Sequence, residues 1–103
     1  MKFIQLIALS AALLLAGNAS ANEALFKKST CVACHNPDKK VVGPALKAIA
    51  AKYAGDATAQ ARLVAKIRSG GKGVWGPVAM PPAPKSVSDD DLNTLVSWIL
   101  SLK

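Results

Sequence analysis

Two thiols and an imidazole are crowded into one short segment of the chain, Cys31-Val32-Ala33-Cys34-His35. This CxxCH pattern is typical of covalent haem attachment. Two thiols add across the two vinyl groups on one edge of a porphyrin, and a gap of two residues lets both sulfurs reach that edge. The residue after the second thiol is carried under the ring, where its imidazole binds the iron. The motif predicts one covalent c-type haem, with thioether bonds to Cys31 and Cys34 and with His35 as an iron ligand.

The same three residues also admit two other sites. In a thioredoxin-like protein, a CxxC pair begins a helix after a strand and exchanges disulfides, but no strand pattern precedes Cys31. A structural zinc site normally needs four ligands. Cys31, Cys34 and His35 supply only three, because the chain has two cysteines and one histidine. Both alternatives rank below haem on these grounds, and both stay open at this point.

Met80 is the only methionine beyond residue 1, and it lies in the proline-rich segment 76–82, GPVAMPP. A lone methionine is most often core filler. A thioether, however, is a weak iron ligand that the chain must hold in place, and prolines on both sides restrict the loop. His/Met ligation raises the reduction potential and leaves no open position for a substrate. Met80 is therefore predicted to be the sixth iron ligand of an electron carrier.

Four helices are expected to position these residues. Asn22 suits the cap of a first helix that runs towards Cys31, and Pro44 suits the first position of a short second helix. A third helix is predicted from near Thr58 to Ser69 by apolar residues at helical spacing.

The last helix is expected to begin at Ser88, which three aspartates follow. Between the third and last helices, the stretch 70–87 is rich in Gly and Pro, and we expect a long functional loop there. No stretch shows convincing alternation for a strand, so the prediction is an all-α fold.

Residues 1–21 resemble an export signal. Lys2 supplies a positive start, Phe3 to Ala16 is almost unbroken apolar sequence, and Ala19-Ser20-Ala21 gives a small-x-small cleavage pattern. The apolar run is shorter than the roughly 18 residues that suggest a membrane span. We expect cleavage after Ala21, one periplasmic domain at 22–103, and no stable membrane insertion. So small a domain usually needs a covalent or metal staple to complete its core.

The charge balance points to a protein partner. Thirteen basic residues against six acidic ones give a net charge of +7, which favours docking onto an acidic surface. Nucleic acid is a poor candidate, because an exported protein does not meet it and aromatic residues are few. The expected interface is the apolar surface near Val32, Pro77, Val78, Pro81 and Pro82, with a basic rim of Lys27, Lys28, Lys39, Lys40, Lys47, Lys72 and Lys85.

Four segments together resemble the short-chain bacterial class I monohaem cytochromes c. They are LFKKSTCVACH at 25–35, VVGPALKAIAAKYAG at 41–55, GVWGPVAMPP at 73–82 and VSDDDLNTLVSWILSLK at 87–103. The resemblance implies the small cytochrome c fold, about four helices wrapped around one haem. It also implies a monomeric periplasmic carrier. Its donor would be a membrane cytochrome complex, and its acceptor a nitrite reductase, a terminal oxidase or a peroxidase.

The same resemblance implies roles for three further residues. Pro44 matches the proline whose carbonyl accepts the hydrogen bond of the proximal histidine, which orients that ligand. Trp75 matches the tryptophan whose indole N–H bonds a haem propionate. Lys66 stands where relatives often have a propionate-binding arginine, and a lysine cannot reproduce the planar guanidinium fork. The stretch 83–86 is also slightly longer than usual, and Phe26 and Trp98 are expected to pack where the first and last helices cross.

Two rival functions remain to be weighed. A loosely held Met80 would open the iron to peroxide, but the chain offers no second histidine and no recognisable pocket acid for proton transfer. The second rival function is that of a haem domain within a larger complex. The sequence favours a free carrier, and no enzymatic activity is expected.

Overall fold

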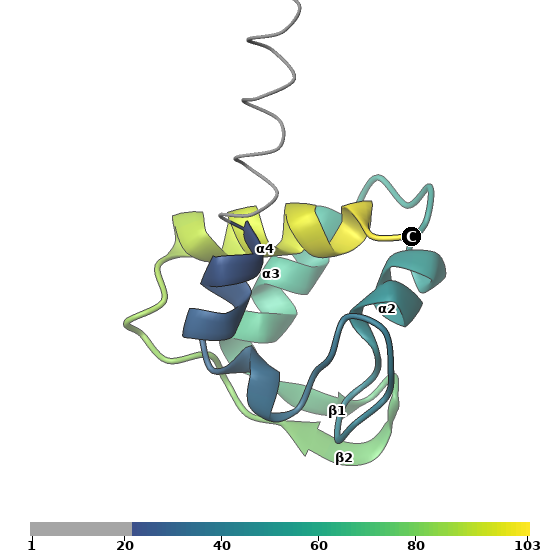
Figure 1. Ribbon diagram of the computed structural model, residues 1–103, viewed down its shortest axis with the longest axis horizontal. Coiled ribbons are helices and arrows are strands. Elements are labelled where there is room, and N and C mark those ends of the chain that lie inside the picture. The colour runs from purple at the N-terminus through teal and green to yellow at the C-terminus, as the bar shows by residue number, and fades with distance from the viewer. Residues whose placement is uncertain (1–21) are drawn as a thin grey trace, which may run out of the picture.

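The computed structural model describes residues 22–103, and its last helix extends along one end of the fold. In Figure 1, this helix, α4 (Asp89–Ser101), lies across one end of the molecule, and the helix at 22–28 and α3 (Ala59–Ser69) run away from it. The far end holds the short 3-10 helix η1 (Cys31–Ala33) and a hairpin of β1 (Gly71–Gly73) and β2 (Gly76–Met80). Helix α2 (Leu46–Lys52) closes one side. The all-α prediction with about four helices is confirmed.

Helix α4 begins where its capping residues predict. The Ser88 side chain accepts a hydrogen bond of 3.1 Å from the Asp91 N–H, and three aspartates occupy the first turn. A side-chain acceptor satisfies one of the free amides at the helix start, and the acids face the positive end of the helix dipole. Leu92, Leu95 and Val96 recur on one face and are each 1% exposed. This face supplies the largest part of the core.

The first and last helices cross through an aromatic pair. The ring centroids of Phe26 and Trp98 lie 5.6 Å apart with the planes tilted by 44°, a separation typical of favourable aromatic contacts. Phe26 is 2% exposed and packs in one cluster with Leu46, Val87, Leu92 and Leu95. The predicted packing of Phe26 against Trp98 is confirmed.

Helix α3 is started by a side chain that lies before it. Asp56 Oδ1 accepts hydrogen bonds from the Thr58 N–H at 2.8 Å and from the Thr58 hydroxyl at 2.7 Å, and Asp56 also pairs with Arg62 one turn into the helix. These bonds lower the pKa of Asp56, those from Thr58 contributing most. At the other end, Gly70 adopts a left-handed φ of 71° and stops the helix. The predicted bounds, near Thr58 to Ser69, are confirmed.

Three expectations about local structure are wrong. Asn22 is itself helical and so is not the cap of the first helix. Pro44 lies outside α2, whose capping position is Ala45. The stretch 70–87 is not structureless, because β1 and β2 pair antiparallel within it, with Gly71 opposite Met80 and Gly73 opposite Gly76.

The hairpin escapes sequence analysis because glycine, and not strand-forming side chains, makes it possible. Gly71, Gly73 and Gly76 have φ values of 135°, 111° and 117°, which only glycine adopts without strain. No helix among residues 22–103 is long and apolar enough to cross a membrane. The expected signal segment, 1–21, lies outside the described residues.

Candidate functional site

A cavity of ≈ 840 Å³ opens between η1, α2, α3 and the hairpin. This volume lies within the range of small-molecule and cofactor sites. Apolar side chains such as Ile49, Leu63 and Ile67 form much of its wall. All seven residues singled out from the sequence border it: Cys31, Cys34, His35, Pro44, Lys66, Trp75 and Met80.

The orientation of His35 is set by the chain that faces it. Its Nδ1 lies 2.8 Å from the carbonyl oxygen of Pro44. Because a carbonyl only accepts, Nδ1 carries the proton, and the lone pair of the ring is on Nε2. The Gly43 N–H bonds the Cys34 carbonyl at 2.8 Å, which ties the 43–44 step to the CxxCH segment. This arrangement suits a neutral imidazole that binds a metal through Nε2.

Gly43 is a site residue that the sequence analysis missed. A Cβ at this position would lie 2.6 Å from Cε1 and 3.0 Å from Nδ1 of His35. The imidazole thus lies directly against the backbone of Gly43, in the space that the side chain of a larger residue would take. No local sequence pattern marks this role, because it depends on a contact with His35 across a chain reversal.

One turn of 3-10 helix brings the two thiols to the same side of the chain. The His35 and Cys34 amides both bond the Cys31 carbonyl, at 2.9 and 3.2 Å, and side chains three positions apart align in such a turn. Neither cysteine is in a disulfide, and both are partly buried. Burial raises the pKa of the Cys31 thiol, partly offset by a backbone hydrogen bond. Thr30, immediately before the turn, has a left-handed φ of 67°.

Met80 ends β2 and borders the same cavity as the cysteine turn, and the end of α3 lies against it. A Cβ on Gly70 would come within 2.6 Å of the Met80 carbonyl oxygen and 2.8 Å of the Pro82 nitrogen. Only glycine allows such close contact between the two backbones. Ala83 adds a hydrogen bond of 2.9 Å from its N–H to the Ile67 carbonyl. The strand end that bears the thioether is thereby held on α3.

Trp75 and Lys66 border the cavity from different elements. Trp75 lies in the hairpin turn, is 44% exposed, and has the Lys52 ammonium 5.5 Å from its ring centroid. Lys66 extends from α3 over the backbone of β1, since its Nζ lies 2.5 Å from the position a Cβ on Gly71 would take. The two polar groups, an indole N–H and an ammonium, suit acidic substituents on a bound ring.

The donor set fits a haem better than the alternatives. One imidazole, one thioether and two neighbouring thiols surround an apolar cavity, which matches thioether attachment and His/Met ligation. Among residues 22–103, no group of three or more His, Cys, Asp and Glu side chains is placed to hold a metal ion. Zinc is thus disfavoured. A thioredoxin-like site is disfavoured too, because within the described residues a helix at 22–28 and a turn directly precede Cys31.

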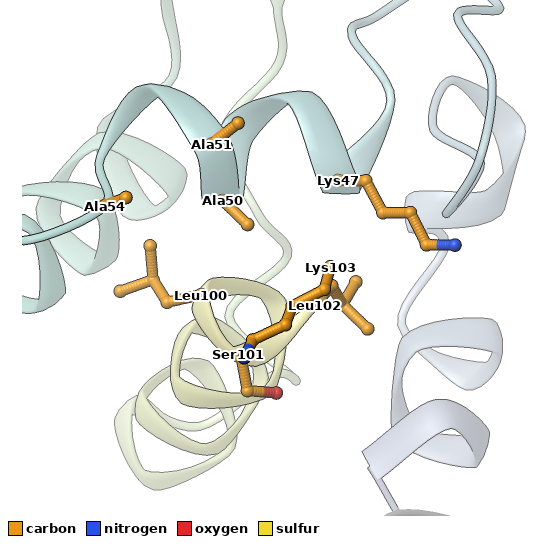
Figure 2. Close-up of a pocket in the computed structure, with 8 residues that line it drawn as sticks. All are labelled: Lys47, Ala50, Ala51, Ala54, Leu100, Ser101, Leu102 and Lys103. Atoms are coloured by element: carbon orange, nitrogen blue, oxygen red, sulfur yellow. The ribbon is translucent and has the colours of Figure 1, made fainter.

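A second hollow, of ≈ 360 Å³, lies between α2 and the C-terminal end of α4. Figure 2 shows Ala50 of α2 pointing towards α4, with Leu100 and Leu102 across the hollow and Lys47 and Lys103 at its edge. Apart from Lys47 of the expected basic rim, it contains none of the residues that the sequence singles out, and no group with evident reactivity lines it.

The chain matches proteins of known family along nearly all of its described length. The family model Cytochrome c matches residues 19–103. Cytochrome c-551 of Pseudomonas aeruginosa is 56% identical over 81 residues, which are 79% of this chain and 76% of that protein. Cytochrome c-552 of Nitrosomonas europaea is 53% identical over 94 residues, 91% of this chain and 90% of that protein.

Solved structures agree with the sequence matches. The crystal structure of wild-type Nitrosomonas europaea cytochrome c552 superposes with a TM-score of 0.75 at 53% identity, covering 79% of this chain and 99% of that one. The class 1 cytochrome MtoD from Sideroxydans lithotrophicus gives a TM-score of 0.67 at 31% identity, covering 81% and 94%. Sequence motif, fold and cavity lead to one conclusion: the chain belongs to the cytochrome c family, as a small class I electron carrier with one covalent c-type haem.

Proposed function

We propose that the chain is a periplasmic single-electron carrier whose haem iron is bound by His35 and Met80. Cys31 and Cys34 would form the thioether bonds, and Pro44, Lys66 and Trp75 would contact the ligand or the propionates. The observation that carries the proposal is the hydrogen bond of 2.8 Å between His35 Nδ1 and the Pro44 carbonyl. It leaves Nε2 as the lone-pair nitrogen of a ring that borders the same cavity as Met80.

When bound, the haem supplies one-electron redox chemistry, and the residues of the chain tune and protect it. The Pro44 carbonyl holds the His35 tautomer and raises the basicity of the imidazole. Met80 supplies a soft, weak thioether, which favours the reduced state and raises the potential. The close contact of Gly70 with the Met80 backbone supports a sulfur held in one place.

Lys66 and Trp75 are proposed to bind the propionates from two sides. Lys66 lies on α3 and Trp75 in the hairpin turn, and both border the cavity. A single ammonium makes one contact where a guanidinium fork would make two. The propionate therefore depends more on the indole N–H than it would with an arginine on α3.

The proposed docking surface surrounds the exposed end of the site. Val32, Val74 and Val78 are 48%, 55% and 63% exposed, and Trp75, which follows Val74 in the chain, is exposed as well. Lys40 and Lys72 border the same cavity as Val74 and Val78, and exposed apolar groups with cations nearby are typical of a transient redox interface. The proposed partners are acidic proteins: a membrane cytochrome complex as donor, and a nitrite reductase, oxidase or peroxidase as acceptor.

Export is proposed through residues 1–21, with cleavage after Ala21. The support is the charged start, the apolar run and the small-x-small pattern. N-terminal sequencing of the protein recovered from the periplasm tests it, and a first residue other than Asn22 would contradict the cleavage site.

An absorption spectrum of the exported, haem-loaded protein in both redox states tests the ligation. Covalent c-type bands together with the weak far-red band of ferric iron bound to methionine sulfur are expected. The Met80→Ala variant should keep the covalent bands and lose the far-red one. Retention of that band in Met80→Ala would exclude Met80 as the ligand, and absence of covalent haem in the unsubstituted protein would overturn the whole proposal.

A further inference from the structure

The segment between β2 and α4, residues 81–88, has few backbone donors with which to bind the rest of the fold. Three of its eight residues are prolines, which have no N–H. The Val87 N–H is used within the segment, on the Pro84 carbonyl at 3.0 Å. Among the described residues, the segment has one backbone hydrogen bond to α3: the Ala83 N–H donates to the Ile67 carbonyl oxygen at 2.9 Å. A single backbone bond is a weak attachment for a segment that directly follows Met80.

Arg68 of α3 supplies the missing donors. Its Nη1 donates to the Pro84 carbonyl at 3.2 Å, and its Nη2 donates to the Val87 carbonyl at 2.6 Å and to Asp89 Oδ1 at 2.8 Å. One guanidinium thus spans the segment 81–88 and reaches the first residue of α4. The side chain is 32% exposed, so water competes less for these bonds than at a fully exposed site. A lysine has one ammonium and cannot reproduce this geometry.

The anchored end of the segment is stiffly connected to Met80. Pro81 and Pro82 follow Met80 directly, and the proline ring fixes φ at each. A displacement at Pro84 is therefore passed back along the chain, since the intervening residues have little freedom to absorb it. The Gly70 contact places the end of α3 against the Met80 carbonyl. Arg68, two residues earlier on the same helix, completes the attachment.

We propose that Arg68 is a positioning residue that holds Met80 at the haem by binding the segment 81–88 to α3. The inference rests on the proposed function, in which the Met80 sulfur is the sixth iron ligand. Without Arg68, the segment and Met80 separate from α3 more often. An external ligand then reaches the iron more easily, because its apparent affinity follows the population of the open state.

Imidazole titration of the ferric holoprotein measures that population, with loss of the far-red band as the signal. Arg68→Gln is expected to bind imidazole about tenfold more tightly, as the loss of charged hydrogen bonds would predict. Arg68→Lys keeps the charge but loses the fork, and should resemble Arg68→Gln. The control Lys103→Gln removes a charge at the C-terminus, outside the cavity that holds the proposed iron ligands, and should stay within about twofold of the unsubstituted protein.

A second pair of variants separates the acidic contact from the carbonyl contacts. Asp89→Asn weakens one of the three acceptors of Arg68, and should tighten imidazole binding by roughly twofold to threefold. Asp90→Asn removes an acid from the same first turn of α4 without touching Arg68, and should have no effect. Equal effects of the two variants would overturn the assignment of Asp89 to this network.

The outcomes distinguish this inference from the proposed function beneath it. If the unsubstituted ferric protein lacks the far-red band, Met80 ligation fails and the role of Arg68 fails with it. If the band is present and Arg68→Gln has the imidazole affinity of the unsubstituted protein, the inference alone is overturned. An unchanged imidazole affinity overturns the inference even if Arg68→Gln lowers the free energy of unfolding, because Arg68 would then contribute to stability without positioning Met80. Full restoration by Arg68→Lys would show that charge, and not the paired carbonyl bonds, is responsible.

Discussion

At the scale of residues, the site depends on backbone groups as much as on the side chains of its sequence motifs. The Pro44 carbonyl orients His35, and the missing side chain of Gly43 leaves room for the imidazole. Spacing and residue type predict Cys31, Cys34 and His35 as site residues, because each would act through its own side chain, and all three border the cavity. The role of Gly43 could not be predicted, since it depends on a distance of 2.6 Å across a chain reversal.

Thr30 is predicted to be a strained residue at the start of the haem-binding turn. A β-branched residue with φ of 67° is a rare outlier, and asparagine tolerates this region better. Thr30→Asn should therefore raise the free energy of unfolding by about 0.5–1 kcal/mol. Thr30→Val keeps the strain but loses the hydroxyl bond of 2.6 Å to the Ser29 carbonyl, and should lower it by about 1 kcal/mol.

Denaturant unfolding of the three holoproteins measures both effects. A loss of stability in Thr30→Asn as large as that in Thr30→Val would show that the left-handed backbone costs nothing here, and that only the hydroxyl matters.

At the scale of elements, helices with apolar periodicity and side-chain caps were predictable, and the hairpin was not. Ser88 and the buried face of α4 carry their signals locally, within one or two turns. The strand pair instead arises from glycine φ values and from register between Gly71 and Met80, neither of which leaves a pattern of alternating side chains. Pro44 lies outside α2 for a reason that the local sequence does not show, because its carbonyl oxygen is bonded to His35 Nδ1.

The start of α3 predicts a pH-dependent contribution to stability from Asp56. Its hydrogen bonds from Thr58, and then its pairing with Arg62, hold its pKa below the ordinary value of 3.8. A carboxylate with a depressed folded-state pKa stabilises the protein above the unfolded-state pKa, and that contribution is lost as the pH falls through the folded value. Asp56→Asn should therefore lower the melting temperature at pH 7, and the difference should vanish in strong acid.

Thermal melts of the holoprotein across the acid range test this, with Asp90→Asn as a control in another helix. A difference between Asp56→Asn and the unsubstituted protein that persists unchanged into strong acid would contradict the assignment to the ionised carboxylate.

At the scale of the whole molecule, the fold is built around a volume that the polypeptide does not fill. The cavity of ≈ 840 Å³ lies beside a core of few fully buried side chains. Domains of this size are marginally stable even when well packed. We therefore expect the covalent haem of the family to complete the core as well as to perform the chemistry.

Removal of the attachment sites should therefore unfold the molecule. The double variant Cys31→Ser, Cys34→Ser is expected to lack a cooperative thermal transition, because the apolar cavity wall would face water. Circular dichroism during heating measures this. A sharp transition close to that of the holoprotein would show that the polypeptide core suffices alone.

The basic charge predicts a salt-dependent reaction with an acidic partner. Replacing Lys27, Lys28, Lys39 and Lys40 by glutamine should slow electron exchange at low ionic strength by roughly tenfold, and the deficit should shrink near 1 M salt, where charges are screened over about 3 Å. Stopped-flow mixing with a soluble acidic redox protein measures the rate. Lys103→Gln is the control, because the C-terminus lies away from the hairpin in Figure 1. An equal effect at Lys103 would indicate net charge and not a docking surface.

The place of α4 in the core also sets how much of the chain must be present before the core can close. Phe26 and Leu46 are buried against Leu92 and Leu95 of α4, the last of the described helices along the chain. A chain that lacks α4 therefore has no packed interior behind the cysteine turn. We expect the two thiols to be more accessible in such a chain than in the folded protein, so that haem attachment can precede closure of the core.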